Sequence, residues 1–483
     1  MLPVTSVQPA QGDISNTPSI SPVQNETVNT KGLVHRAKES LTLILDGTKP
    51  KSNIAVLDGV RALAILTVVF YHLSVKSGVA TIPWLDPHIV AIIYTGYGGV
   101  TLFFVLSGFL LFLPYIKSLL FDNGWPSVRM FYLRRILRIV PAYYLSLFLI
   151  VLLAQPVYLQ PDHWKELLLF LTFTMDFSQK TFQQLNSPFW SLAVEWQFYM
   201  LLPWLALALR FVVQRGSLKR RVWTLVLCLC GVMAWGIATR YAGYYITNHP
   251  TENFGIPSIA LKVARALLYG CGGPGLHGKF LEDFAIGMLA ALCYIMASNT
   301  PSGKWNTILR RLSPVFLVSS ILWLAVMAFW NSELLVPPSS DPFAVFLYGN
   351  AYNTFHEFGL ALGYGSLVLA VLFGGFILKR IFEWSLLRWI GVVSFSMYLW
   401  HNPILLPFAN AMAPFIQNWS PFRVFCLNLL WVIIAVPSFS FLGYVLIEKP
   451  FMRISDGLRR NQQKKVKESV VVPQTLPAMV PDK

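Results

Sequence analysis

The sequence is poor in charge. Only 12% of its 483 residues are Asp, Glu, Lys or Arg, whereas 55% are hydrophobic. A soluble globular domain carries about a quarter of charged residues, so this composition excludes an ordinary soluble fold. Cysteine is scarce as well, and the five residues show no spacing typical of a zinc site or a disulfide framework. The first fifty residues lack an apolar core segment, so we expect no signal peptide there.

Composition divides the chain into three regions. Residues 1–52 are polar and rich in Ser, Thr, Pro and Gln, which predicts a disordered arm. Residues 53–453 alternate long apolar stretches with short polar loops and predict one membrane domain. Residues 454–483 are polar again and carry a run of lysines, which predicts a basic tail.

Long apolar stretches are what the middle region has in abundance. Stretches of about 17–25 residues can each cross the hydrocarbon core of a bilayer as a helix. The predicted spans are 56–75, 96–116, 139–155, 189–212, 221–241, 280–297, 314–330, 356–376, 389–410 and 422–446. The segment 164–177 is too short to span, and we interpret it as re-entrant or interfacial. The sequence therefore predicts an all-α polytopic membrane bundle of about ten transmembrane helices.

The basic residues predict how these spans are oriented. If successive loops alternate sides, 29 of the 38 Lys and Arg residues fall on one side, eight on the other, and Arg61 lies inside a span. Cytoplasmic loops are the ones enriched in Lys and Arg. We therefore expect both termini, the arm and the tail to be cytoplasmic in a multi-pass protein, as in a bacterial inner membrane. The net charge of +16 is then explained by topology and anionic headgroups, so we expect no nucleic-acid partner.

Three spans carry an ionisable residue that is costly in lipid. His72, Glu195 and His401 fall at similar predicted depth in the outer half of the membrane, and Ser107 falls near its middle. Such residues usually face a bundle interior or a wet cavity and mark functional sites. Glu195 and His401 could equally be polar contacts that fix helix packing. An imidazole has an unperturbed pKa of about 6.5, which makes His72 the best candidate for a general base.

Arginines are concentrated near the predicted cytoplasmic face. Arg134, Arg135 and Arg138 stand at the foot of the third span, and Arg61 lies eleven residues before His72. Planar guanidinium groups suit phosphate, so the three could bind a nucleotide carrier. The alternatives are a topology anchor for the three arginines and, for Arg61, a side chain that snorkels to the headgroups.

Six segments in order resemble the acyltransferase-3 family, over almost the whole membrane domain. They are LDGVRALAILTVVFYH (57–72), GGVTLFFVLSGFLL (98–111), RRILRIVPAYY (134–144), SPFWSLAVEWQFYMLLP (187–203), SFSMYLWHNPI (394–404) and IEKPF (447–451). The first contains the family's arginine, ten residues and histidine pattern. One departure is Phe395, where the family commonly has tyrosine.

The resemblance implies a membrane O-acyltransferase. Such enzymes move an acyl group, commonly acetyl, from cytoplasmic acyl-coenzyme A to a hydroxyl of a cell-surface carbohydrate or glycolipid. Acyl-coenzyme A would be a co-substrate, with no permanently bound cofactor. Arg61, Arg134, Arg135 and Arg138 would bind it. His72 would be the base, with Glu195 orienting it, His401 nearby and Ser107 at the oxyanion. A secondary metabolite such as a macrolide sugar as acceptor, a succinyl or longer acyl donor, and a transporter remain open.

Overall fold

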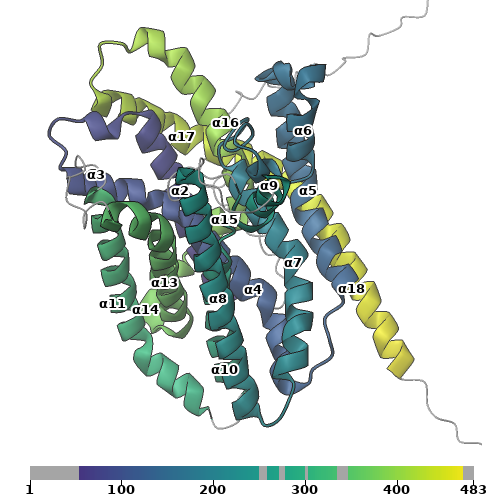
Figure 1. The fold of residues 1–483 in the computed structure, drawn as a ribbon. Helices are drawn as coiled ribbons and strands as arrows, with labels where there is room; N and C mark the ends of the chain where they lie inside the picture. Colours follow the sequence, from purple (N-terminus) through teal and green to yellow (C-terminus); the bar gives the residue numbers. More distant parts are fainter. Residues whose placement is uncertain (1–53, 250–257, 271–277, 300–302, 334–345, 471–483) are drawn as a thin grey trace, which may run out of the picture. The chain divides into compact units, whose positions relative to one another are not determined.

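The computed structural model describes residues 54–249, 258–270, 278–299, 303–333 and 346–470. All of these residues belong to one compact unit of the chain. The predicted arm, residues 1–52, lies outside the residues that the structure describes. Within these ranges the secondary structure is helical, with no strand. The α-helices are α2 Val56–Lys76, α3 Pro87–Tyr94, α4 Gly99–Phe121, α5 Val128–Leu153, α6 Trp164–Leu171, α7 Phe189–Val213, α8 Leu218–Asn248, α9 Ser258–Ala264, α10 Leu281–Asn299, α11 Lys304–Glu333, α13 Tyr352–Phe373, α14 Phe376–Phe382, α15 Ser385–Val392, α16 Ser394–Met412, α17 Pro421–Gly443 and α18 Lys449–Val470 (Figure 1).

The predicted membrane bundle is confirmed. In the described ranges, nine helices are long and apolar enough to cross a bilayer, and each overlaps one of the predicted spans. The remaining predicted span, 389–410, falls on α15 and α16. Helix α16 has 19 residues and contains Pro403 and Pro407. Helices suit this solvent because they satisfy every backbone donor and acceptor within the segment.

Two boundaries differ from the sequence pattern in ways that matter for the site. The helix expected at 356–376 begins nine residues earlier, with the π-helical turn Leu347–Ala351 leading into α13. The predicted non-spanning segment 164–177 forms the eight-residue helix α6 and the 3-10 turn Met175–Phe177. At about 1.5 Å per residue, α6 is far too short to cross a membrane. In the tail, α18 continues as a helix to Val470 and packs along α5 (Figure 1).

Burial separates inner from outer helices. In α10 and α13, 72% of the most apolar stretch is buried, compared with 22% in α8 and α11. The inner helices α4 and α10 approach closely where a glycine of one helix faces the backbone of the other. A Cβ on Gly108 of α4 would lie 2.1 Å from the Phe284 carbonyl oxygen, and one on Gly287 of α10 would lie 2.0 Å from that of Val105. Small residues of this kind allow two membrane helices to pack backbone against backbone.

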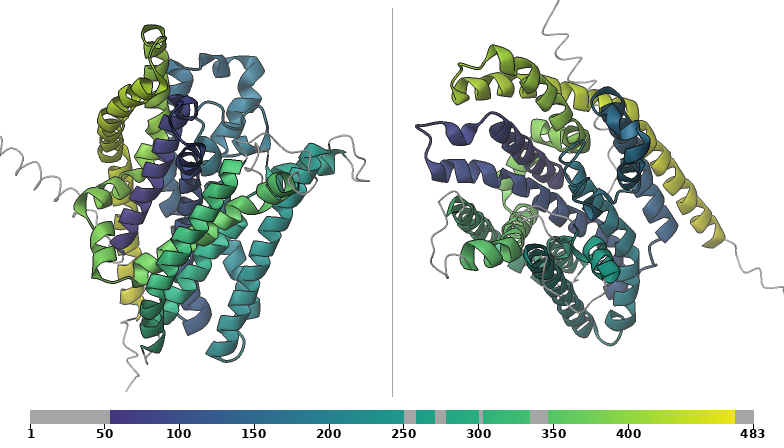
Figure 2. Two further views of the ribbon diagram at one scale, coloured as in Figure 1. Left: turned by 90° about the vertical axis from the view of Figure 1, so that its left-hand side faces the viewer. Right: turned by 45° about the horizontal axis from the view of Figure 1, so that its top comes forward.

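Helix α2 carries Arg61 near its first turns and His72 near its last. It packs against α4, α15 and α16. The views in Figure 2 agree: α2, in purple, lies beside the yellow-green α16 and α17. At about 1.5 Å per residue, the eleven residues from Arg61 to His72 correspond to about 16 Å along the helix axis.

Candidate active site

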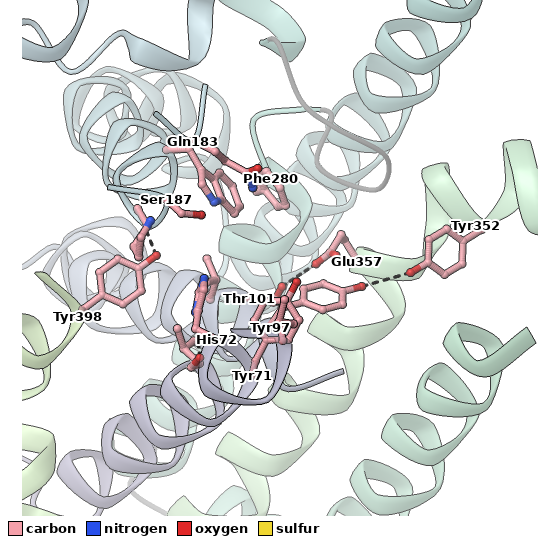
Figure 3. Close-up of a pocket in the computed structure, with 15 residues that line it drawn as sticks. Tyr71, His72, Tyr97, Thr101, Gln183, Ser187, Phe280, Tyr352, Glu357 and Tyr398 are labelled. Atoms are coloured by element: carbon pink, nitrogen blue, oxygen red, sulfur yellow. Dashed lines mark hydrogen bonds between the residues drawn. The ribbon is translucent and has the colours of Figure 1, made fainter. Parts of the chain in front are cut away.

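A cavity of about 320 Å³ lies beside the end of α2 (Figure 3). Its wall is built by α2, α4, the loop before α7, α13 and α16. The polar and aromatic residues of that wall are Tyr71, His72, Tyr97, Thr101, Gln183, Ser187, Trp190, Phe280, Tyr352, Glu357 and Tyr398. Cavities of about 300–1,000 Å³ with apolar walls and few polar groups are typical of ligand sites. Of the sequence-predicted residues, His72 alone lines this cavity among the described residues.

His72 and His401 are brought together as their predicted depths indicated. His401 Nδ1 lies 2.9 Å from the Tyr398 carbonyl oxygen and 3.1 Å from that of Met397. A carbonyl only accepts hydrogen bonds, so His401 Nδ1 carries the proton and its Nε2 has a lone pair. That Nε2 lies 3.3 Å from His72 Nδ1, which is also 3.0 Å from the Val68 carbonyl oxygen.

Two acceptors around one nitrogen determine the tautomer of His72. Its Nδ1 faces the His401 lone pair and the Val68 carbonyl, so we assign the proton to Nδ1. His72 Nε2 then has a lone pair, and the ring lines the cavity. An imidazole in this tautomer can accept a proton from a ligand hydroxyl while Nδ1–H remains anchored.

Glu195 does not line this cavity. Its Oε1 accepts hydrogen bonds from Ser107 at 2.5 Å and from the Tyr199 hydroxyl. The expected contact with His72 is not formed in the described structure. Because the Ser107 proton is directed to Glu195 and Ser107 does not line the cavity, its hydroxyl is not available for the oxyanion role considered from the sequence.

A cluster of arginines lies near Glu195. Arg61 and Arg135 are each close enough to Arg138, Glu195 and Tyr199 to interact with them electrostatically. The Arg135 guanidinium also lies over the Tyr199 ring, 5.9 Å from its centre. In the described part of the chain, neither Arg135 nor Arg138 forms an ion pair with a carboxylate, whereas Arg61 Nη1 lies 3.4 Å from Asp58 Oδ1. Two half-buried, unpaired guanidinium groups side by side favour an anionic ligand.

Arg134 departs from the predicted set. Its charged neighbours include Asp456 and Arg459 of α18. Arg135 and Arg138, three residues apart, share the face of α5 directed toward Arg61 and Glu195, and Arg134 stands at the edge of that face. The structure therefore groups Arg61 with Arg135 and Arg138, and it turns Arg134 toward α18.

Sequence reasoning missed two polar parts of the cavity wall. Glu357 accepts a hydrogen bond from Thr101 at 2.7 Å and is 3% exposed. Tyr398 lies 2.5 Å from Ser191 Oγ and donates to the Pro188 carbonyl at 3.1 Å. Glu357 stood at the predicted start of its span, where a charge is unremarkable. No sequence signal marks it, because its position inside α13 follows from the helix start that the structure shows.

The arrangement combines a base and an anion site on one membrane helix. His72 presents an unprotonated nitrogen to a cavity, and Arg61 faces the unpaired arginines of α5 about 16 Å further along α2. This pairing can bind an extended ligand with an anionic end and a reactive end. It can then remove a proton from a second ligand in the cavity.

Comparison with known proteins finds similar chains that are named O-acetyltransferases. YrhL of Bacillus subtilis (strain 168), provisionally named a peptidoglycan O-acetyltransferase, is 27% identical over 425 residues, covering 83% of this chain and 55% of the relative. The peptidoglycan O-acetyltransferase OatA of Listeria monocytogenes is 25% identical over 441 residues, covering 85% and 56%. A provisionally named O-acetyltransferase of Staphylococcus aureus (strain COL) is 24% identical over 437 residues, covering 84% and 58%.

The chain thus spans little more than half the length of these curated relatives. No solved structure matches it. The sequence model of the family described as "Acyltransferase domain" matches residues 54–447, from before α2 to the end of the last apolar helix. The match includes the first five motifs and the first residue of the sixth, Ile447, and with them His72, the arginine cluster and His401. The chain belongs to this acyltransferase family, as its motifs predicted.

Proposed function

We propose that this protein is a membrane O-acetyltransferase that moves an acetyl group from acetyl-coenzyme A to a hydroxyl of a cell-envelope glycan. The family supports acyl transfer, and relatives named for peptidoglycan O-acetylation support this acceptor class. The observation that carries the proposal is the pair of acceptors around His72 Nδ1, from which its tautomer is assigned. Two acceptors hold its Nδ1 proton, so Nε2 is left to act as a base in the cavity.

The donor site in this proposal is the arginine cluster. Phosphates of coenzyme A bind Arg135 and Arg138, which have no carboxylate partner among the described residues. The pantetheine arm then extends beside Arg61 along α2 toward His72. The distance of about 16 Å is roughly half of a hydrocarbon core that is about 30 Å thick. The donor therefore enters from the end of the bundle where the arginines lie.

The reaction follows from this placement. The acceptor hydroxyl gives its proton to His72 Nε2 as its oxygen attacks the acyl carbon. The carbon–sulfur bond then breaks, and the imidazolium returns the proton to the departing thiolate. The products are the ester and free coenzyme A, so the proton balance on the protein is zero. His401 orients His72 throughout, because its Nε2 accepts from the Nδ1 proton.

The direction of transfer rests on the basic residues. With 29 of 38 Lys and Arg residues on one side, we place both termini and the arginine cluster in or near the cytoplasm. The cavity then lies toward the opposite side, where envelope glycans are assembled. The acetyl group would cross the membrane on the donor and not on the acceptor.

The test uses the purified chain in lipid nanodiscs with acetyl-coenzyme A labelled in the acetyl group. The expected result is label bound to glycan chains and released by mild base, as an ester is. Release of coenzyme A without any labelled ester, at a rate equal to that of empty nanodiscs, would show that this chain alone does not transfer acetyl groups.

A further inference from the structure

Glu357 is a buried carboxylate in the same cavity wall as His72. It belongs to α13, is 3% exposed, and accepts a hydrogen bond on Oε2 from Thr101 Oγ1 of α4 at 2.7 Å. In the view of Figure 3, His72 lies between Tyr398 on one side and Thr101 with Glu357 on the other. The mechanism proposed above gives Glu357 no task.

The second oxygen of Glu357 lacks a partner. Oε1 is buried and accepts no hydrogen bond from any described residue. Tyr97 is the other hydroxyl near this carboxylate, but its proton is committed elsewhere. His356 Nε2 lies 3.1 Å from the Met327 carbonyl and so donates to it, which leaves His356 Nδ1 to accept from Tyr97 at 3.0 Å. A buried carboxylate oxygen without a donor is costly, and on a residue of the cavity wall it is free to accept a hydrogen bond from a ligand.

The surrounding charges keep Glu357 in place without occupying Oε1. Arg240 of α8 is near enough to interact with it electrostatically, and Arg240 hydrogen-bonds Glu282 of α10. Glu282 and Asp283 are fully buried behind the cavity and do not line it. Among the described residues, Glu357 is therefore the one carboxylate that reaches the cavity.

We propose that Glu357 Oε1 binds a second hydrogen-bond donor of the acceptor, a hydroxyl or amide N–H next to the hydroxyl that receives the acetyl group. This inference rests on the proposed function. The cavity matches a sugar ring, since it combines aromatic walls, a carboxylate and a base within about 320 Å³. Glu357 would thus select acceptors with two neighbouring polar substituents over simple alcohols. A site built to bind a substrate donor strongly rejects an analogue that lacks it.

The test measures acetyl transfer to methyl glycosides of hexoses and N-acetylhexosamines, each with its set of analogues lacking one ring substituent. Wild type is compared with Glu357→Ala, Glu357→Gln and Asp283→Asn in nanodiscs. For wild type, removal of one substituent should lower kcat/KM by about ten-fold or more, because it leaves Oε1 unpaired. For Glu357→Ala, kcat/KM for the parent sugar should fall by a similar factor. Removal of the same substituent from the sugar should then lower kcat/KM little further. The KM for acetyl-coenzyme A should stay within about two-fold, since charge-assisted contacts to its phosphates are unchanged.

Glu357→Gln distinguishes the two kinds of donor. Thr101 needs an acceptor, so the amide oxygen faces Thr101 and the amide NH₂ takes the place of Oε1. A sugar hydroxyl can accept from that NH₂, so kcat/KM should then exceed that of Glu357→Ala. An acetamido N–H cannot accept, and Glu357→Gln should then be as impaired as Glu357→Ala.

Asp283→Asn is the matched control. It removes a carboxylate of the same buried group without changing the cavity wall, so the pattern across the analogues should stay that of wild type. If every analogue loses the same factor in wild type and in both Glu357 variants, Glu357 does not contact the acceptor and the inference is overturned. If wild type itself acetylates none of the sugars, the proposed function fails first, which is a separate result.

Discussion

His401 Nε2 lies 3.3 Å from His72 Nδ1, so two histidines from helices far apart in sequence form one hydrogen-bonded pair. His401 is 1% exposed, and its own Nδ1 is held by two backbone carbonyls. The backbone of α16 therefore fixes the proton of His401, and His401 helps to fix that of His72. These successive hydrogen bonds explain how a neutral imidazole can be oriented in a membrane without a carboxylate partner.

Removal of His401 should impair the enzyme without abolishing it. In His401→Ala, His72 Nδ1 keeps the Val68 carbonyl as acceptor, so we expect a smaller loss of kcat than the about 10²–10⁴-fold that a general base contributes. His401→Gln should recover part of the rate, because its amide oxygen can accept from Nδ1–H. Steady-state acetyl transfer measures both variants. The control is His163→Ala, which should match wild type because this half-buried histidine of the 3-10 turn Pro161–His163 is hydrogen-bonded to Glu166 and does not line the cavity.

The arginine cluster should control donor affinity. Charge-assisted hydrogen bonds contribute about 1.5–3 kcal/mol, so Arg135→Ala and Arg138→Ala should each raise the KM for acetyl-coenzyme A about ten-fold or more. Arg134→Ala is the matched control, because this neighbouring arginine faces α18, and its KM should stay within about three-fold of wild type. Equal effects of all three substitutions would return the cluster to the role of a topology anchor.

Ser107 should matter for stability more than for chemistry. Its hydroxyl donates to Glu195, so Ser107→Ala leaves that carboxylate with Tyr199 as its remaining donor. We expect a loss of about 1–3 kcal/mol in unfolding free energy. Thermal unfolding in detergent measures it. A fall in kcat of about 10²–10³-fold with unchanged stability would instead indicate a direct oxyanion contact.

The topology gives a further prediction. Reporter fusions after Gln160, between α5 and α7, and after Lys379, in α14, should report opposite sides of the membrane. The fusion at Lys379 should report the cytoplasm, because that loop belongs to the basic side. The same side for both would contradict the proposed orientation.

The sequence was sufficient where helix ends could be read from polar boundaries. The predicted start of the first span at 56 coincides with the start of α2 at Val56, and the depths assigned to His72 and His401 led to a real contact. The predicted helix start was wrong near Glu357, because the π-helical turn at Leu347–Ala351 extends the helix before its apolar run begins. Hydropathy alone does not report such an extension.

Other features depend on tertiary packing. Helix α18 separates Arg134 from the other two arginines of α5, Arg135 and Arg138, because Arg134 lies toward α18. Glu195 was placed by depth near His72, but depth does not specify the neighbouring helix. Its partner Ser107 lies on α4, where Gly108 allows close approach of α10. The tautomer of His72 could not be predicted, because it depends on carbonyl groups of two helices.

The most direct test of the account is the rate of acetyl transfer by His72→Ala in nanodiscs, measured together with its affinity for acetyl-coenzyme A. The account predicts a rate about 10²–10⁴-fold below wild type, because the base that takes the hydroxyl proton is gone. Affinity for the donor should be retained, because the arginines that bind it lie about 16 Å away along α2. A His72→Ala protein that transfers acetyl groups within a few-fold of wild type would contradict the central role of His72.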